Sequence, residues 1–415
     1  MLEYDIAVIG GGPAGMAAAL AAYEKGIKSI VIIDREAKLG GILQQCIHNG
    51  FGLHKLGREL TGPEYAEHYA ERLRKTDIHV LSETMVTKLT SDKVITAQNR
   101  KGIVKIQAKA VILAMGCRER SRGALSICGS RPAGVFSAGT AQKLINCEGY
   151  CIGKKAVILG SGDIGLIMAR RLTLEGAKVE AVCELLPYSG GLTRNIVQCL
   201  EDFGIPLYLS TTVVEIHGKK RVEGVTVAQV DSDRKILENT KRFIPCDTLL
   251  LSVGLIPENE LTAQAGVAMS PVTGGAIVDE TRQTSVPGIF ACGNVLHVHD
   301  LVDYVSDEAE LAGQGAAAYV HGNCNQRTVA VEAGAGVRYV LPQLLHTDHP
   351  DNISLYLRVA APGGKVRVVA TSAGKRLASA LKLRTAPGEM EKLTINREIL
   401  ESIEDTITVE LEEIP

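Results

Sequence analysis

The strongest constraint on the fold is a stretch near the N-terminus, residues 6–34, with the sequence IAVIGGGPAGMAAALAAYEKGIKSIVIID. A run of apolar residues leads into a glycine-rich turn, a segment of small residues follows, and a second apolar run ends at Asp34. This order predicts a strand, a tight turn, a helix and a second strand. It is typical of the βαβ unit that opens a dinucleotide-binding domain.

The glycine-rich turn, which we call the first glycine motif (residues 10–15), gives each glycine a distinct expected task. Gly10 allows the turn, Gly12 lets the backbone approach a pyrophosphate, and Gly15 lets the helix pack closely against the strand. The N-terminus of the helix offers unpaired N–H groups and a partial positive charge to the phosphates. Asp34, nineteen residues after Gly15, is expected to accept a hydrogen bond from a ribose hydroxyl. The other residues assigned to this site are Pro13, Ala14 and Arg35.

The same arrangement recurs at residues 155–184, where a second glycine motif (residues 160–165) lies between an apolar strand and a helix. Glu184 follows the last glycine of this motif by nineteen residues, the interval that separates Gly15 from Asp34. Because glycines and acid both recur, we expect two bound dinucleotides; a duplicated fold without ligands is the alternative. The residues assigned to the second site are Gly160, Gly162, Asp163, Ile164, Gly165 and Glu184.

Coarser patterns place these motifs in an α/β chain. Thr61 and Glu64 form a capping box for a helix that ends near Lys75. Residues 78–114 alternate apolar and polar residues around a turn at residues 100–102, as a β-meander does, and end in the string AVILAMG.

The second half of the chain repeats this order before the pattern changes. A helix is expected near residues 192–203 and a second meander at 207–245, which leads to the string DTLLLSVG. A strand at 288–291 and a helix at 306–319 follow. The tail from about residue 334 alternates apolar and polar residues between Pro and Gly turns, which favours a small β-sandwich or barrel.

Composition narrows the class of protein. The chain has 415 residues, enough for two or three domains. Its net charge of -2 does not predict a basic surface that would bind nucleic acid. No apolar run of about 18 residues predicts a transmembrane helix, and the N-terminal stretch lacks the features of a signal peptide. Ten cysteines occur without a CxxC pair, which favours reduced thiols and a cytoplasmic location. We treat the CxxxC of Cys147 and Cys151 as coincidence.

Four motifs resemble the two-dinucleotide flavoproteins, the superfamily of pyridine nucleotide-disulfide oxidoreductases and thioredoxin reductases. They are the two glycine motifs, AVILAMG and TSVPGIFACGN, and the resemblance covers about residues 4–325. It implies a discontinuous FAD domain and an inserted domain for NAD(P)H. Beyond the first glycine motif it assigns Gly293 and Asn294 to FAD. The Gly40-Gly41 pair itself indicates backbone that passes close to a ligand, and with Ala114 and Gly116, at the end of AVILAMG, it is assigned to the same site. Asn294 stands where the family usually has Asp; its amide can still accept a hydrogen bond from a ribityl hydroxyl and can also donate one.

The resemblance therefore implies an α/β fold with two tandem Rossmann-like domains and a small C-terminal β-rich domain. The expected domains are residues 1–120 with 266–328 for FAD, 121–265 for NAD, and 329–415 for the β-sandwich. It also implies that the helix starting near Ser306 points its N-terminus at the flavin.

Longer strings narrow the resemblance to a bacterial subgroup of FAD/NAD-linked oxidoreductases associated with an anaerobic-type glycerol-3-phosphate dehydrogenase. They include GGILQQCIHNGFG and ACGNVLHVHDLVDYVSDEAE. Related chains are subunits of opine, proline and cyanide-forming amine dehydrogenases. We expect an enzyme that exchanges hydride between NAD(H) and FAD as the NAD-linked component of such a system, in an oligomer or complex. One alternative is a nucleotide-binding subunit of an amine or opine dehydrogenase.

Cys46 is the candidate catalytic residue for a further alternative, a stand-alone NADH oxidase, peroxidase or disulfide reductase. It lies after the Gly40-Gly41 pair, where disulfide reductases of the superfamily have two cysteines and this chain has one. A single thiol can act through a sulfenic acid or a mixed disulfide. The alternative is that Cys46 is a small residue that packs near the flavin and has no chemical role.

Two further expectations concern charge and metal. Glu184 would bond a ribose diol and repel a 2′-phosphate, so NADH is favoured over NADPH. His297 and His299 would share one face of a strand, but we expect no metal there and favour contacts behind the flavin or simple solvation. Asp303 and Tyr304 are candidates to line the open face of the flavin. Cys117, Cys128 and Cys292 are expected to be structural.

Overall fold

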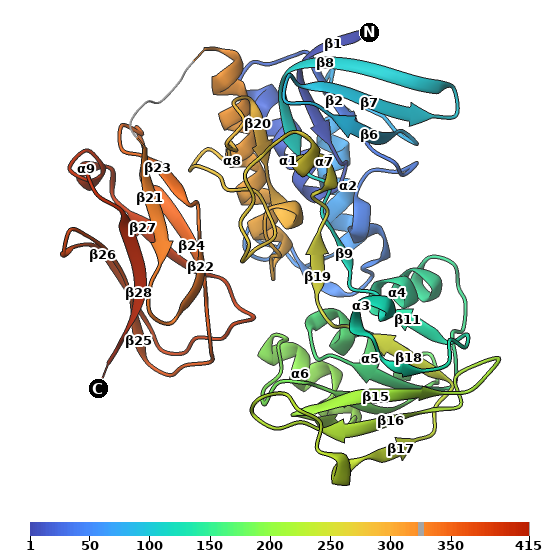
Figure 1. The fold of residues 1–415 in the computed structure, drawn as a ribbon. Helices are drawn as coiled ribbons and strands as arrows, with labels where there is room; N and C mark the ends of the chain where they lie inside the picture. The colour runs from blue at the N-terminus through green and yellow to red at the C-terminus, as the bar shows by residue number, and fades with distance from the viewer. Residues whose placement is uncertain (323–327, 415) are drawn as a thin grey trace. The chain divides into compact units, whose positions relative to one another are not determined.

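The computed structural model describes residues 1–322 and 328–414. The chain divides into two compact units, the first made of Met1–Cys117 and Pro257–Pro415 and the second of Arg118–Ile256 (Figure 1). The three-domain boundaries expected from the sequence stay predictions. The last of them adjoins residues 323–327, which lie outside the described residues and include Cys324.

The first unit is built on a seven-stranded sheet in the order β5-β2-β1-β8-β7-β6, with β20 paired to the end of β8. Its strands are β1 (Leu2–Ile9), β2 (Ile30–Ile33), β5 (His79–Leu81), β6 (Met85–Leu89), β7 (Val94–Asn99), β8 (Gly102–Leu113) and β20 (Ile289–Ala291). β1 runs parallel between β2 and β8, with Ile6 opposite Ile30 and Ala110. Because β20 comes from the second chain segment and completes this sheet, the expected discontinuous α/β domain is confirmed.

Helices and one short pair of strands complete this part of the first unit. They are α1 (Pro13–Glu24), η1 (Gly41–Gln45), β3 (Asn49–Phe51), β4 (Leu60–Thr61), α2 (Gly62–Leu73), α7 (Glu260–Gln264), η4 (Gly293–Val295) and α8 (Val302–Val320). α1 consists mainly of buried alanines and crosses α8 at short range. A Cβ on Gly313 of α8 would lie 2.2 Å from the carbonyl oxygen of Ala18, so only glycine allows this crossing.

Two sequence expectations have clear outcomes at these helices. The capping box of α2 is confirmed, because the Thr61 N–H donates to Glu64 Oε2 at 2.8 Å and the reciprocal bond is present. The start expected for the last helix was wrong: α8 begins at Val302, one turn before Ser306.

The C-terminal segment folds into two packed sheets, which confirms a β-rich domain. One sheet has the order β23-β21-β28-β25-β26 and the other has the order β22-β24-β27. The buried core between them is aliphatic, with Leu355, Leu357 and Val368 fully enclosed. The elements are β21 (Thr328–Ala333), β22 (Val337–Leu341), β23 (Leu344–His346), β24 (Ile353–Val359), β25 (Val366–Ser372), β26 (Lys375–Lys382), β27 (Glu391–Ile395), α9 (Arg397–Leu400) and β28 (Ile407–Glu413).

The second unit repeats the parallel βαβ plan with a five-stranded sheet in the order β11-β18-β12-β13-β14, beside a sheet in the order β10-β15-β16-β17. The strands are β9 (Cys117–Glu119), β10 (Cys128–Gly129), β11 (Val135–Ser137), β12 (Lys155–Leu159), β13 (Lys178–Cys183), β14 (Leu207–Tyr208), β15 (Thr211–His217), β16 (Gly224–Gln229), β17 (Arg242–Ile244), β18 (Thr248–Leu251) and β19 (Leu255–Pro257). The helices are α3 (Arg122–Leu125), α4 (Ala138–Asn146), α5 (Asp163–Leu174), α6 (Thr193–Cys199), η2 (Glu201–Phe203) and η3 (Glu238–Thr240). The expected helix near residues 192–203 is confirmed as α6 with η2.

Within the described residues, every helix is too short or too polar to cross a membrane.

Candidate functional site

The first glycine motif forms an open cradle between β1 and α1. Gly10 has a φ of +107°, and a Cβ there would lie 2.3 Å from the carbonyl oxygen of Ala114. A Cβ on Gly15 would lie 1.8 Å from the carbonyl oxygen of Gly10. A Cβ on Gly12, in contrast, would meet nothing within 4 Å. The two flanking glycines therefore serve packing, while Gly12 faces free space at the N-terminus of α1, which fits a pyrophosphate.

Asp34 closes the edge of this cradle. One carboxylate oxygen accepts the N–H of Gly11, and the other accepts the N–H of Glu36 at 2.7 Å. The carboxylate is buried, while the adjacent Arg35 is exposed. Each carboxylate oxygen can accept a second hydrogen bond, so Asp34 still has the capacity to bind a ribose hydroxyl.

The Gly40-Gly41 pair lies against the same cradle. Gly40 has a φ of +112°, and its N–H donates to the carbonyl oxygen of Gly11 at 2.8 Å. A Cβ on Gly41 would lie 3.2 Å from the Cα of Gly12. This places the start of η1 beside the space that Gly12 faces. On the other side, Gly116 has a φ of +73° with open space around it.

Cys46 follows η1 and is half-buried. Its thiol donates to the carbonyl oxygen of Ile42 at 3.3 Å, and its Cβ packs against Gly62 at the start of α2. All nine described cysteines are free thiols, so the structure brings no second cysteine into a disulfide with Cys46.

The loop after Cys46 is fixed to the first turn of α8. The buried Asp303 carboxylate accepts the N–H groups of Gly52 at 3.1 Å and His54 at 2.9 Å. The His54 ring stacks on Tyr304 with an interplanar angle of 18°. Lys55 pairs with Asp307 and Glu310 on the next turn of the helix. The expected lining role of Asp303 is thus accompanied by a structural one.

The motif TSVPGIFACGN (residues 284–294), which we call the last FAD motif because the resemblance assigns it to FAD, ends in η4. It contacts the first glycine motif directly. Gly293 has a φ of +73°, and a Cβ there would lie 2.8 Å from the Cβ of Ala14. Its N–H donates to Glu308 Oε2 at 2.9 Å. Asn294 Oδ1 accepts both the backbone N–H of His299 at 3.1 Å and its ring Nδ1–H at 3.3 Å. Its Nδ2 donates to the thiol of Cys117 at 3.6 Å. Asn294 therefore has an N–H rather than a carbonyl oxygen left to offer a ligand.

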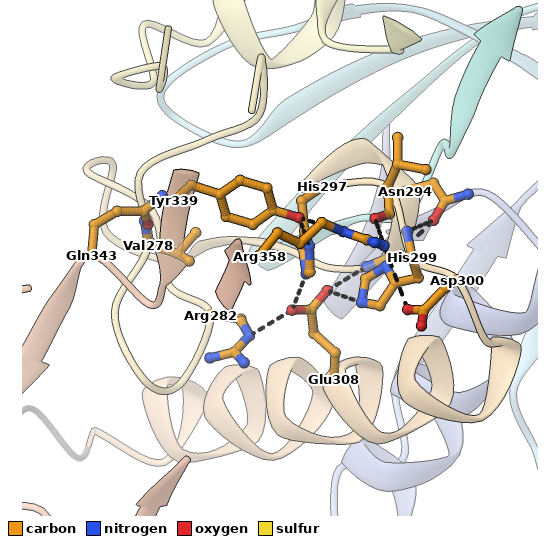
Figure 2. A network of polar contacts seen from close by, with 12 residues as sticks. Val278, Arg282, Asn294, His297, His299, Asp300, Glu308, Tyr339, Gln343 and Arg358 are labelled. Carbon is orange, nitrogen blue, oxygen red and sulfur yellow. Dashed lines mark hydrogen bonds and ion pairs between the residues drawn. The ribbon is translucent and has the colours of Figure 1, made fainter. Parts of the chain in front are cut away.

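A group of buried side chains surrounds Glu308 behind this motif (Figure 2). We call it the Glu308 cluster; its members are Arg282, His297, His299, Glu308, Tyr339 and Arg358. Glu308 Oε1 accepts from Arg282 Nε at 3.1 Å and from His297 Nε2 at 3.2 Å. The two histidines do not lie on a strand, as expected from the sequence, but in the turn after η4, and both Nε2 atoms face the same carboxylate.

Burial and charge define the protonation states of the cluster. Burial alone would raise the pKa of Glu308, but His297 and Arg282 stabilise the carboxylate and hold that pKa below its ordinary value. Burial lowers the pKa of His299 to about 3, and the neighbouring His297 acts in the same direction. Glu308 is therefore an anion and His299 a neutral imidazole near neutral pH.

His297, His299 and Glu308 also have the spacing of metal ligands, with their donor atoms within 4.8 Å of one another. The contact between Arg282 and Glu308 argues against a divalent cation there. Arg282 is 1% exposed, and its guanidinium is neutralised by Glu308. A cation bound to the same carboxylate would place two like charges side by side in a buried environment. We therefore assign the three residues to a hydrogen-bonded network.

The second glycine motif forms an equivalent cradle in the second unit. A Cβ on Gly160 would lie 2.0 Å from the carbonyl oxygen of Ser252, and one on Gly165 would lie 2.7 Å from that of Gly160. A Cβ on Gly162 would have only Ser252 Oγ nearby, at 3.8 Å. The middle glycine again faces open space at a helix N-terminus, which fits a second dinucleotide.

Glu184 occupies the position that Asp34 has in the first unit. Its Oε2 accepts from the Ser161 N–H at 2.9 Å and the Ser161 hydroxyl at 2.7 Å, and Oε1 accepts from the Leu186 N–H at 2.9 Å. Asp163 Oδ1 instead accepts from Leu192 N–H and Asn195 Nδ2 and so fixes the start of α6. Ile164, in the first turn of α5, packs against the core of the unit.

A model of the family described as "Pyridine nucleotide-disulphide oxidoreductase" matches residues 4–334. The chain belongs to this family. Its members are flavin-dependent oxidoreductases that use FAD and NAD(P)H, and the two cradles of this oxidoreductase fit those groups. The C-terminal sandwich beyond residue 334 lies outside the match.

Curated relatives of this oxidoreductase are distant. An opine oxidase subunit of Agrobacterium tumefaciens (strain Ach5) is 27% identical over 319 residues, which cover 70% of this chain and 61% of the relative. An alkyl hydroperoxide reductase subunit of Pseudomonas aeruginosa is 29% identical over 311 residues, 71% of this chain and 54% of the relative. The chain thus spans between half and two thirds of the length of these relatives.

The fold is similar to that of solved thioredoxin reductases. The enzyme of T. acidophilum aligns with a TM-score of 0.63 and 24% identity, covering 78% of this chain and 99% of that one. The enzyme of Lactococcus lactis aligns with a TM-score of 0.63 and 21% identity over 77% of this chain and 100% of that one. These likenesses confirm the fold class, with the C-terminal sandwich as an addition to it.

Sequence reasoning missed most of the Glu308 cluster. It named His297 and His299 but none of Arg282, Glu308, Tyr339 and Arg358. One signal was present for Glu308: it shares a helical stripe with Ala312 and Ala316, which are fully buried. An acid four and eight residues before small apolar positions of a helix predicts a buried carboxylate with a partner.

Proposed function

We propose that this oxidoreductase takes electrons from NADH through FAD and passes them to a separate redox protein. The observation that carries the proposal is the pair of cradles in which the middle glycine, Gly12 or Gly162, faces open space beside a buried acid. When bound, FAD supplies the chemistry, accepting a hydride from the nicotinamide and returning electrons to an acceptor.

The side chains of the protein bind and orient the two nucleotides in this proposal. Gly12 and the N-terminus of α1 bind the FAD pyrophosphate, and Asp34 binds its ribose. Gly162 with the N-terminus of α5 binds the second pyrophosphate. Glu184 bonds a ribose diol and disfavours a 2′-phosphate, so NADH is the preferred donor. Asn294 contributes an amide N–H toward the ribityl chain.

For the acceptor, we propose the dehydrogenase subunit of a glycerol-3-phosphate or related system. The support is the resemblance of GGILQQCIHNGFG and ACGNVLHVHDLVDYVSDEAE to the associated subgroup. The free state of the nine described cysteines favours an external acceptor over an internal disulfide. Several relatives have names that make them subunits, such as those of an opine oxidase and a hydrogen cyanide synthase.

Two alternatives remain open to test. Cys46 lies in the loop after the Gly40-Gly41 pair and η1, which favours a thiol-dependent NADH oxidase, peroxidase or disulfide reductase as the first alternative. The relatives named as subunits favour the second, a subunit of an amine or opine dehydrogenase complex that binds nucleotide without using NADH.

Stopped-flow mixing of the FAD-loaded protein with NADH separates the three. The proposal predicts rapid bleaching of flavin absorbance in the wild type and in Cys46→Ser, with Cys128→Ser as a matched control because Cys128 is exposed and lies in the second unit. Bleaching without turnover in Cys46→Ser supports the thiol enzyme. A flavin that NADH does not bleach overturns the proposal and supports the second alternative. Recovery of the flavin absorbance after the NADH-reduced protein is mixed with the oxidised, co-purified dehydrogenase subunit tests the acceptor.

A further inference from the structure

The C-terminal sandwich reaches the last FAD motif through two side chains. Tyr339 on β22 and Arg358 on β24 both contact the turn of residues 297–300 that follows η4 (Figure 2). Arg358 Nη2 donates to the carbonyl oxygen of Val298 at 3.1 Å and to Asp300 Oδ1 at 3.4 Å. The other oxygen of Asp300 accepts the N–H of Met390, also from the sandwich, at 3.2 Å. The turn is therefore held by the sandwich as well as by α8.

A guanidinium only donates, so Arg358 Nε donates to the Tyr339 oxygen at 3.2 Å. The proton of the half-buried Tyr339 hydroxyl is then available to His297 Nδ1, 3.2 Å away, and we take it to be donated there. His297 then carries its proton on Nε2 and donates it to Glu308 Oε1. The sandwich thus fixes the tautomer of His297.

His299 makes this dependence stronger. Asn294 Oδ1 must face the backbone N–H of His299, and so the ring Nδ1 is the protonated nitrogen. The neutral ring then presents the lone pair of Nε2 to Glu308 Oε2 at 3.4 Å. Two acceptors facing each other repel, and so Glu308 keeps its position only because His297, Arg282 and the Gly293 N–H donate to it.

We propose that Tyr339 and Arg358 are positioning residues for the FAD site, acting through His297 and Glu308 on the Gly293 amide. This rests on the proposed function, in which Gly293 and Asn294 approach FAD. The C-terminal sandwich is then a working part of the flavin site. Loss of the Tyr339 hydroxyl leaves His297 Nδ1 without a donor, loosens the hold on Glu308 and releases Gly293 from its place against Ala14.

The test uses Tyr339→Phe in the full FAD-loaded chain, with Tyr356→Phe as the matched control. Tyr356 lies in the same sandwich, and its ring faces the Arg282 guanidinium at 5.9 Å, a contact that phenylalanine keeps. Its hydroxyl forms none of the bonds described above for the Glu308 cluster. FAD release on dilution, read by flavin fluorescence, should be about three- to tenfold faster in Tyr339→Phe, as expected for one lost hydrogen bond. The flavin absorption bands should shift in Tyr339→Phe and stay unchanged in Tyr356→Phe.

A second measurement does not involve the flavin. Hydrogen exchange of the Gly293 amide in the FAD-free chain should be faster in Tyr339→Phe than in Tyr356→Phe, because that N–H is bonded to Glu308. Arg358→Lys should reproduce both effects, since an ammonium cannot reach Tyr339, Val298 and Asp300 together.

Equal FAD release, spectrum and Gly293 exchange in Tyr339→Phe and Tyr356→Phe overturn the proposal. Failure of NADH to bleach the flavin overturns the proposed function instead, because FAD release and amide exchange are measured without NADH.

Discussion

The two glycine motifs form the same cradle in different surroundings. In the first unit, α1 is buried on nearly all sides and is covered by α8, which comes from the other end of the unit. In the second unit, α5 is amphipathic and packs beside α4 and α6 from the same chain segment. The contact of the last glycine also differs, since a Cβ would lie 1.8 Å from the carbonyl oxygen of Gly10 at Gly15 and 2.7 Å from that of Gly160 at Gly165. Both motifs specify a cradle, and the cradle of the first unit is the more tightly packed.

The largest difference should appear on adding a methyl group to the last glycine of each motif. Gly15→Ala should destabilise the first unit by more than about 3 kcal/mol, because the Cβ meets backbone that cannot move. Gly165→Ala should cost about 1–3 kcal/mol in the second unit. Urea unfolding followed by far-UV circular dichroism measures both. Equal losses of stability in the two variants would show that the two cradles are packed equally tightly.

The middle glycines should respond in the opposite way, with binding lost and folding kept. Gly12 and Gly162 have extended backbone angles that alanine adopts without strain, and the space around them is open. Gly12→Ala should yield a stable protein with FAD affinity reduced by at least about a hundredfold. Gly162→Ala should keep its flavin but lose rapid reduction by NADH. Calorimetric titration and stopped-flow absorbance measure these effects. A flavin retained in Gly12→Ala would refute the assignment of the first cradle.

The acids should distinguish the two nucleotides. Glu184→Gln should raise the ratio of NADPH to NADH efficiency about tenfold, because the charge that repels a 2′-phosphate is removed. Asp34→Asn is the matched control and should weaken FAD without changing that ratio. Steady-state kcat/KM values with both donors provide the measurement. An unchanged ratio in Glu184→Gln would place the specificity elsewhere in the second unit.

The smallest expected effect is a pH dependence confined to the first unit. The His346 ring on β23 bonds Glu280 Oε1 at 3.0 Å, and this bond raises the pKa of His346 above its ordinary 6.5. The folded state then binds the proton more tightly than the unfolded state. The stabilisation is complete below pH 6.5 and is lost as the pH rises through the folded value.

His346→Gln should therefore cost about 1 kcal/mol at about pH 6 and less at about pH 9. Differential scanning calorimetry at both pH values gives the comparison, with the transition of the second unit as internal control. A pH-independent loss would mean that the ring acts through packing rather than charge.

Much of this architecture could be predicted from local sequence. Each glycine motif lies within about 30 residues of its acid, and apolar runs on both sides fix the strands, so the cradles were visible without tertiary information. The capping box of Thr61 and Glu64 is equally local. Gly40 and Gly41 were also placed beside the first cradle by a short-range pattern.

The rest depends on contacts between distant segments. Arg282, Glu308, Tyr339 and Arg358 come from four separate parts of the chain, and no spacing rule relates them. The turn at His297 and His299 was predicted as a strand because apolar and polar residues alternate there. Contacts with Glu308 instead hold its backbone in a turn. The start of α8 was misplaced for the same reason, since Asp303 is fixed by the amides of Gly52 and His54 from far upstream.

The crossing of Ala18 and Gly313 also sets the order in which a growing polypeptide acquires its parts. On the ribosome, residues 118–256 are contiguous and have all their neighbours as soon as they emerge. The opening βαβ segment is made earlier but must wait, with its alanine helix uncovered, until α8 and β20 have been synthesised. The first cradle is therefore started before the second but finished after it. A chain that terminates before residue 313 should therefore leave its oldest segment exposed to proteases and chaperones.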